Sequence, residues 1–221
     1  MKDEEYSIGL EGIDVKIKPE CMIMVLGDAY SGHKLFCHQC CGSSLKNNEG
    51  VIYISTNDTA KKVVEEISRF SSSLENLRIV DCYSLTFDEN CPRDIENVSC
   101  VSGPLDLGMI LASTSNHIED LWRKSGIKRI RVVLDSVSTL LMYSSIKPVF
   151  RFLHVFTGRI KAVGGICFFV MNESIHKPEE VNAIQQLMQG LMHFKGEELL
   201  LKGFVNDKFR YRIETSMIKV I

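Results

Sequence analysis

The chain has 221 residues, a formal net charge of −2, and a hydrophobic content of 45%. These values are ordinary for a soluble globular protein, and they exclude a global electrostatic attraction to nucleic acid or anionic membranes. The longest apolar runs, 21–26 and 166–171, are too short to cross a bilayer. The acidic start, 1–5, lacks the apolar region of a signal peptide, so we expect a cytoplasmic protein with no membrane partner.

The first third of the chain predicts two strand–helix units. Residues 1–20 are polar and contain three Gly or Pro, so they predict a short lead-in. The continuously apolar run 21–26 predicts a strand covered on both faces. A helix is expected over 32–45, a strand over 51–55, and an amphipathic helix over 57–70 with Thr56 or Asn57 as its N-cap.

The remainder continues the alternation and then changes character. We expect strands at 77–83, 130–135 and 165–171, helices at 105–123, 147–163 and 179–188, and a long surface loop at 84–104. Three short β segments follow, at 190–195, 199–205 and 209–214, joined by turns that favour antiparallel hairpins. The expected fold is α/β: one domain over 1–221, with a doubly wound, mostly parallel sheet and a C-terminal antiparallel β extension.

A glycine-rich turn follows the first predicted strand and opens the first helix. It reads Gly27-Asp28-Ala29-Tyr30-Ser31-Gly32-His33-Lys34. The spacing of its two glycines is that of the Walker A phosphate-binding loop, whose backbone N–H groups and helix N-terminus favour an anion. His33 and Lys34 stand where that motif has lysine followed by serine or threonine, so the motif is degenerate.

Eight cysteines raise the question of metal or disulfide chemistry. Cys21, Cys82 and Cys167 lie in apolar runs and are expected in the core. Cys37, Cys40 and Cys41 lie on one predicted helix, where Cys37 and Cys41 share a face with His33. A zinc site there is the minor alternative, because a second cysteine pair is missing. Cys91 and Cys100 could pair under oxidation, although reduced thiols are the default expectation.

Together these motifs resemble the RecA/KaiC-like ATPase superfamily over nearly the whole chain. The resemblance lies in Gly32-His33-Lys34 with Phe36 and Gln39, in 53–55, in the Walker B-like run 132–141 ending its strand at Asp135, and in 187–195 and 199–203. It implies a RecA-like P-loop fold with ATP as cofactor. It also implies a site formed by Gly27, Asp28, Ala29, Tyr30, Ser31, Gly32, His33, Lys34 and Asp135. The family forms rings or filaments, so a second copy or a related RecA-fold protein is the expected partner.

Three catalytic parts of that family are altered here. The hydroxyl that binds Mg²⁺ is missing, because Lys34 occupies its position, and this argues against Mg²⁺. Asn57 and Asp58 replace a glutamate pair, which leaves Asp58 as the remaining candidate for a catalytic base. Lys202 remains from a basic finger whose arginine is absent. The resemblance therefore implies a catalytically impaired protein with weak or absent ATP binding, which acts in regulation or partner binding.

Lys34 and Asp135 suggest a more specific hypothesis. In an active relative the Walker B acid and the loop hydroxyl converge on one magnesium ion. We predict that the ammonium of Lys34 takes the place of the metal and pairs with Asp135, since a buried carboxylate without a counter-charge costs several kcal/mol. The simpler alternative is that Asp135 only hydrogen-bonds to the backbone or to Ser136.

Two other functions remain open from the sequence. One is an active ATPase of the KaiC-like group, in signalling or recombination, that uses Lys34 and Asp58 in unusual roles. The other is a DNA-binding recombinase paralogue. It rests only on the basic run Lys124, Lys128, Arg129 and Arg131, which is typical of a solvated face, so nucleic acid is not the expected partner.

Overall fold

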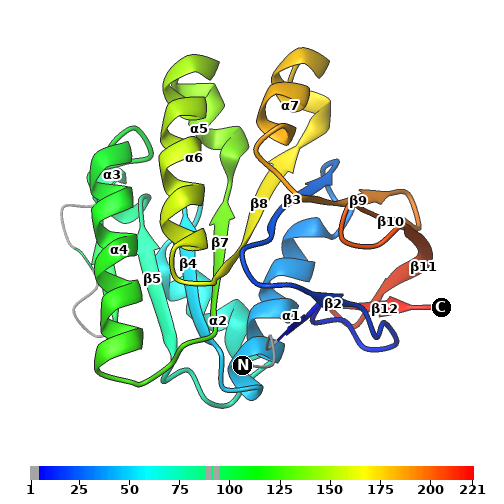
Figure 1. Cartoon of the computed structure of the whole chain (residues 1–221), viewed down its shortest axis with the longest axis horizontal. Coiled ribbons are helices and arrows are strands. Elements are labelled where there is room, and N and C mark those ends of the chain that lie inside the picture. The colour runs from blue at the N-terminus through cyan, green and yellow to red at the C-terminus, as the bar shows by residue number, and fades with distance from the viewer. Residues whose placement is uncertain (1–4, 88–90, 92–94) are drawn as a thin grey trace.

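A computed structural model describes residues 5–87, 91 and 95–221. A ten-stranded sheet forms its centre, in the order β12-β11-β10-β9-β3-β8-β7-β4-β5-β6. The strands from β9 to β6 in this order run parallel, and the three pairs from β9 to β12 are antiparallel. This is the predicted RecA-like arrangement of a mostly parallel sheet with an antiparallel C-terminal extension (Figure 1).

The strands and helices have the following bounds. The strands are β1 (Tyr6–Ser7), β2 (Lys16–Ile17), β3 (Met22–Gly27), β4 (Gly50–Ser55), β5 (Leu77–Asp81), β6 (Val98–Cys100), β7 (Ile130–Asp135), β8 (Ile166–Asn172), β9 (Gly190–Lys195), β10 (Glu198–Lys202), β11 (Asp207–Glu214) and β12 (Met217–Val220). The helices are α1 (His33–Lys46), α2 (Ala60–Ser68), α3 (Ser84–Phe87), α4 (Leu107–Arg123), α5 (Val137–Tyr143), α6 (Ile146–Lys161), the 3₁₀ turn η1 (Glu173–Ile175) and α7 (Pro178–Gln185).

The sheet separates two hydrophobic cores. Alternate residues of β3 enter opposite cores: Ile23 and Val25 join α1, α2 and the C-terminal strands, while Met22, Met24 and Leu26 join α4, α5 and α6. This alternation explains why β3 is apolar at every position, since both faces are covered. Figure 1 shows α4, α5 and α6 standing together on one face of the sheet.

Several predicted boundaries were wrong for identifiable reasons. Helix α2 begins at Ala60, with Thr59 as its N-cap, because Asp58 is tied to Ser55 by two hydrogen bonds in the preceding turn. The predicted loop 84–104 contains α3 and β6, although 88–90 and 92–94 lie outside the described residues. The lead-in forms the small β1–β2 sheet, and its first four residues are likewise not described. The prediction also missed α5 and β12.

The helices were also compared with the length and hydropathy of a membrane-spanning helix. Within the described residues, none of the helices combines the length and apolar character needed to cross a membrane.

Candidate functional site at the carboxyl edge of the sheet

The glycine-rich loop lies at the carboxyl end of β3 and leads into α1. The neighbouring strands end at the same level, because Gly27 pairs with Asn172 of β8, and Ser55 of β4 pairs with Asp135 of β7. Parallel strands therefore bring the loop, the turn after β4 and Asp135 to one edge of the sheet, where open α/β sheets bind ligands.

Side chains of the loop fold back over its own backbone. Ser31 Oγ and His33 Nδ1 form a hydrogen bond of 2.8 Å. A Cβ placed on Gly27 would lie 2.9 Å from His33 Nδ1 and closer still to Ser31 Oγ, so only glycine fits there. The imidazole of His33 thus packs across the concave side of the loop, where the phosphate lysine of a P-loop would act.

The charge of His33 is set by its surroundings. Burial lowers its pKa from the ordinary value of 6.5 and outweighs the opposing effect of Asp135. The ring is therefore neutral at pH 7 and offers no positive charge to a phosphate.

The tip of the loop points into solvent. The N–H of Ser31 donates to the carbonyl of Asp28 at 3.1 Å, which closes a turn through Ala29 and Tyr30. Tyr30 has a positive φ of 67° and is 99% exposed. Its ring makes no part of the inner surface that the loop presents to the sheet edge.

Lys34 joins two acidic side chains. Its Nζ lies 3.3 Å from Asp135 Oδ2, which confirms the predicted pairing, and it also donates to Asp58 Oδ2. Burial disfavours the ammonium, but the charges and hydrogen bonds of Asp135 and Asp58 outweigh burial and raise the pKa of Lys34. Lys34 is therefore a permanent cation at this edge.

Asp135 is also the end of a buried hydrogen-bond chain. Tyr53 Oη donates to Asp135 Oδ2 at 2.6 Å, and His38 Nε2 lies 3.1 Å from the same hydroxyl. Burial lowers the pKa of His38 to about 4. His38 is then neutral and Tyr53 remains a donor, so this chain orients one oxygen of Asp135 while Lys34 balances its charge.

The turn after β4 holds Asp58, the residue that the sequence suggests as a candidate catalytic base. Burial would raise the pKa of Asp58, but hydrogen bonds from Lys34 and Lys62 outweigh it and lower that pKa. Asn57 accepts a hydrogen bond from Thr139 Oγ1 at 2.8 Å. A carboxylate engaged by two ammonium groups is a poor base for activating water, so Asp58 serves as an ion-pair partner in this arrangement.

The C-terminal hairpin supports the loop from outside, which the sequence did not indicate. Tyr211 Oη donates to the carbonyl of Ser31 at 2.5 Å. The side-chain amide of Gln39 bonds both backbone groups of Ile218, at 2.8 and 3.1 Å. Gln39 therefore mimics a neighbouring strand along the free edge of β12, and α1 is fixed to the hairpin.

Gly32 completes this contact. Its φ is +85°, and a Cβ there would lie 2.8 and 2.9 Å from the Cδ1 atoms of Ile218 and Ile213. Both the turn and the hairpin therefore require glycine at this position.

The cysteines of α1 lie in the hydrophobic core. Cys37, Cys40 and Cys41 are fully buried, and burial raises the pKa of each thiol, to about 11 for Cys40. In the part of the chain that the structure describes, no group of three or more His, Cys, Asp or Glu side chains is arranged to hold a metal ion.

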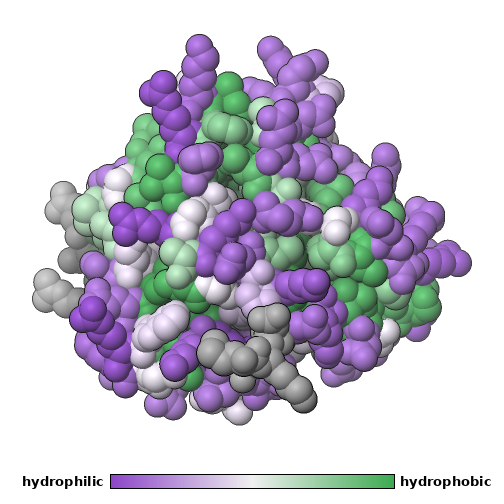
Figure 2. Space-filling model, viewed as in Figure 1, coloured by the Kyte–Doolittle hydropathy of each residue, from purple (hydrophilic) through white to green (hydrophobic). Residues whose placement is uncertain are grey.

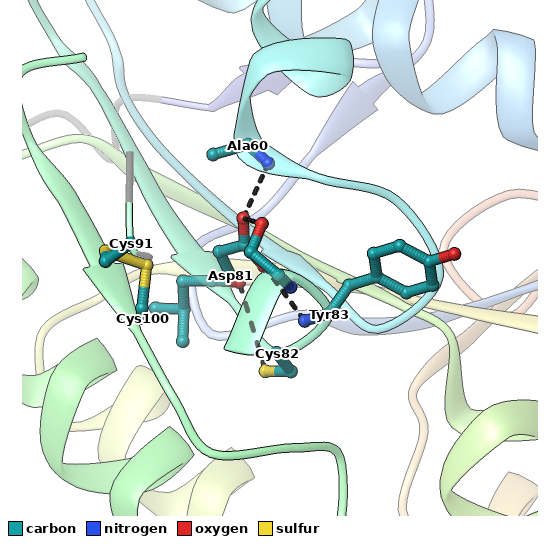
Figure 3. The surroundings of a disulfide bond; sticks show 8 residues. Ala60, Asp81, Cys82, Tyr83, Cys91 and Cys100 are labelled. Carbon is teal, nitrogen blue, oxygen red and sulfur yellow. Dashed lines mark hydrogen bonds between the residues drawn. A yellow bond between two sulfur atoms is a disulfide. The ribbon is translucent and has the colours of Figure 1, made fainter. Parts of the chain in front are cut away.

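The expectation of reduced thiols is wrong for one pair. Cys91 and Cys100 form a disulfide with a Cα–Cα separation of 5.8 Å at the β6 edge of the sheet (Figure 3). Beside it, the carboxylate of Asp81 accepts hydrogen bonds from the N–H groups of Ala60 and Tyr83, at 2.7 and 2.9 Å. The disulfide thus lies next to a carboxylate that fixes the start of α2 and the turn after β5.

Two basic elements suggested by the sequence lie elsewhere. Lys202 pairs with Leu191 in the β10–β9 ladder, away from the carboxyl end of β3, so the structure does not bring it to the loop. Arg131 is fully buried and paired with Glu49, which also binds Arg129 at 2.7 Å. The reading of Arg129 and Arg131 as part of a solvated basic face is therefore wrong.

Comparison with solved structures supports the fold alone. A KaiC-like protein from the hyperthermophilic archaeon Pyrococcus horikoshii OT3, PH0186, superposes with a TM-score of 0.71 at 11% identity, covering 99% of both chains. An uncharacterized protein from Pyrococcus horikoshii, PH0321, solved in complex with an unknown peptide, gives a TM-score of 0.74 at 19% identity over 98% of both chains. The chain therefore has a RecA/KaiC-like fold.

Sequence comparison provides the family. A search of curated proteins finds no significant match. One family model matches residues 21–191, which span β3 to β9 and include the loop, Asp58 and Asp135. The chain therefore belongs to this family, the family of unknown function DUF7504.

Proposed function

We propose that this protein has the fold of an ATPase without efficient hydrolysis, and that it acts as a regulatory or partner-binding protein with weak or absent ATP binding. The observation that carries this proposal is the position of Lys34. Its ammonium contacts Asp135 and Asp58, which end β7 and follow β4 at the same edge of the sheet. A cation that belongs to the chain itself thus occupies the place where a bound metal would be needed.

Mg²⁺ does not fit the side chains at this edge. Its ligands in phosphate-transfer sites are hydroxyls, carboxylates and phosphate oxygens. Here the residue at the hydroxyl position is Lys34, and both nearby carboxylates already pair with ammonium groups. A divalent ion would meet direct repulsion from Lys34, so we derive no metal-dependent step.

ATP phosphates fit the loop poorly for a related reason. Gly27 and Gly32 preserve the shape of a phosphate turn, but Ser31 and His33 bond each other across its concave side. A phosphate entering there would have to break this hydrogen bond. It would gain no charge from neutral His33 and would approach the carboxylates of Asp58 and Asp135.

A partner-binding role has one further support. PH0321, a protein of the same fold, was solved with a peptide bound. An ATPase fold whose sheet-edge acids are paired with Lys34 suits a protein that works through contacts with a partner. A second copy or a RecA-fold relative is the proposed partner, in the cytoplasm.

Titration with a fluorescent ATP analogue, with and without Mg²⁺, tests the proposal. We expect weak or absent binding that Mg²⁺ does not strengthen. The double variant His33→Lys/Lys34→Thr restores the phosphate lysine and the hydroxyl. It should bind the analogue at least tenfold more tightly, and only with Mg²⁺. Lys61→Thr, at an exposed position of α2, is the matched control and should leave binding unchanged.

Two outcomes count against the proposal. Mg²⁺-dependent hydrolysis by the unaltered protein would overturn it. If the double variant folds but gains no affinity, the loop itself cannot hold a phosphate, and loss of the lysine and hydroxyl is not the cause of weak binding.

A further inference from the structure

The exposed side of α6 is a basic stripe. Lys147, Arg151, Val155 and Arg159 follow one another at four-residue intervals and are all exposed, so they form one line along the helix. The helix contains no Asp or Glu. Among the described residues, none of its four lysines and arginines forms a salt bridge with a carboxylate, although the whole chain has a net charge of −2.

The neighbouring helix α4 has a different charge pattern. On α4, by contrast, Arg123 pairs with Glu119 at 2.9 Å and Lys124 pairs with Asp120 at 2.7 Å, each one turn away. Like charges one turn apart, such as Lys147 and Arg151, repel each other and disfavour the helix. The stripe therefore lacks the acidic neighbours that the adjacent helix has.

An apolar groove lies beside the stripe. It has a volume of about 360 Å³ and runs between the C-terminal halves of α4 and α6, with Ile118, Trp122 and Val163 among its lining residues. Arg123 and Arg159 also line it, together with Glu119, whose carboxylate pairs with Arg123 and leaves Arg159 unpaired among the described residues. Trp122 is 39% exposed and Val155, on the stripe, is 48% exposed. Figure 2 shows green apolar surface between purple side chains over these helices.

We propose that this surface docks an acidic amphipathic helix of a partner protein. Carboxylates along one side of the partner helix would pair with Arg151 and Arg159, which leaves one large apolar side chain to enter the groove beside Trp122. Four-residue spacing on α6 matches the repeat of a second helix, so several charges can align at once. The proposal rests on the partner-binding role for its biological purpose, but it concerns a surface separate from Lys34.

A protein helix fits these observations better than a phosphate polymer or a lipid surface. Nucleic acid and anionic membranes would use the cations, but the apolar side chains of the groove would gain little from a phosphate backbone. A membrane would require an exposed apolar belt, whereas here the apolar residues line a groove between two helices. Charge complementarity together with a pocket for one side chain indicates an acidic and apolar peptide.

Trp122 provides a direct measurement, because it is the only tryptophan of the chain. A displayed library of 16-residue helical peptides, with glutamate at four-residue spacing and randomised anchor positions, is selected against the whole protein. Selected peptides should shift the emission of Trp122 to shorter wavelength in a saturable titration. Arg151→Glu/Arg159→Glu should weaken binding at least tenfold, and lysine versions of the same peptides should bind this variant instead.

The control and the alternatives complete the test. Lys61→Glu/Lys195→Glu makes the same change of charge at exposed positions away from α6, and it should leave the affinity unchanged. Equal weakening in this control, or no selected peptide that depends on Arg151 and Arg159, overturns the proposal. Stronger binding of oligothymidine or phosphatidylserine vesicles through the same two arginines also overturns it. ATP-analogue binding should be unaffected throughout, so failure here is distinct from failure at the loop.

Discussion

Lys34 decides how the acidic residues of the sheet edge are stabilised. Asp135 is almost fully buried, and its counter-charge comes from an ammonium on the neighbouring helix. A buried carboxylate that loses its only cation is strongly destabilising, whereas the same acid with a replacement cation is not. Removal of Lys34 should therefore destabilise the folded protein, and another cation that binds Asp135 and Asp58 should reduce the loss.

Lys34→Met tests this dependence. We expect a loss of about 2 kcal/mol in the free energy of unfolding, below the value for a fully buried pair because the Lys34 side chain is 37% exposed. Millimolar Mg²⁺ or Mn²⁺ should restore part of the loss, since Asp135 would then have no cation and Asp58 would keep only the exposed Lys62. Urea denaturation with and without the metal provides both values.

Lys62→Met is the matched control. Lys62 pairs with Asp58 alone, and its side chain is 59% exposed. Its removal should cost less than about 0.5 kcal/mol and produce no response to metal. An equal loss in both variants would mean that the position of Lys34 between the two acids is unimportant.

At the scale of elements, α1 is joined to the C-terminal hairpin. Gln39 and Gly32 lie against β12 at the middle and the start of the helix, and Tyr211 of β11 donates to Ser31 in the loop just before it. The order of the loop therefore depends on strands that are almost 180 residues further along the chain.

Gly32→Ala should destabilise the protein by more than Gly126→Ala. Both glycines have a positive φ, so each substitution costs about 1 kcal/mol in backbone strain. At Gly126 a Cβ would meet nothing within 4 Å, whereas at Gly32 it would press on Ile213 and Ile218. We expect an additional loss of about 1–3 kcal/mol in urea denaturation at Gly32. Equal losses of unfolding free energy in the two variants would show that Ile213 and Ile218 accommodate the added methyl group without cost.

Gln39→Leu should loosen β12 selectively. The variant removes both hydrogen bonds to Ile218, each contributing about 1 kcal/mol. Amide hydrogen exchange should become faster over residues 217–220 and remain unchanged in β4 and β7. Gln186→Leu, on an exposed side of the chain after α7, is the control. Unchanged exchange in β12 would contradict the role assigned to Gln39.

The disulfide between Cys91 and Cys100, at the β6 edge of the sheet, leads to a prediction about thiol reactivity. The six other cysteines are buried and free. Ellman's reagent should therefore find no rapidly reacting thiol in the folded protein, and two after mild reduction. Cys91→Ser/Cys100→Ser should show none in either state. Two reactive thiols before reduction would mean that the pair is not oxidised.

At the scale of the whole molecule, four buried or partly buried histidines are spread over three parts of the chain. Burial lowers the pKa of His33 and His38 on α1, of His117 on α4 and of His176 after η1. A base whose pKa is lower in the folded state is neutral there while the unfolded chain takes up a proton. Stability therefore falls as the pH falls from about 6.5 towards the folded pKa.

His38 should account for a measurable part of this loss. Its pKa of about 4 in the folded state, against 6.5 when unfolded, corresponds to about 3 kcal/mol between these pH values. Lowered pKa values of the other three histidines act in the same direction. His38→Gln should flatten the curve of unfolding free energy against pH, whereas exposed His154→Gln should leave its slope unchanged. Identical slopes would contradict the assignment to His38.

The sequence was sufficient for features that local pattern determines. Local pattern predicts the strand β3 from its apolar run, the loop from the spacing of its glycines, and the acid at the sheet edge from its place at the end of β7. Because parallel strands end together, the contact of Lys34 with Asp135 was also predictable. The contact of Lys34 with Asp58 was not predictable, because the pattern of 57–70 predicts that Asp58 lies in the first turn of a helix.

Other features depend on contacts that local pattern does not encode. The residues of α5 are apolar or hydroxylated throughout, so they lack the periodicity of an amphipathic helix. Strand β12 is short and gains its stability from Gln39 on a distant helix. Arg131 was misread because a buried arginine is rare, and only the fold brings Glu49 beside it.

The place of β3 between β8 and β9 has a kinetic consequence. Its partners in the sheet come from residues 166–172 and 190–195, so the central pairings close loops of well over a hundred residues. Such non-local topology slows folding. Until both partners have been synthesised, both backbone edges of β3 are unpaired and its apolar side chains are uncovered, so the nascent chain is exposed to aggregation. Slow, chaperone-sensitive refolding is therefore built into the same strand that positions the loop.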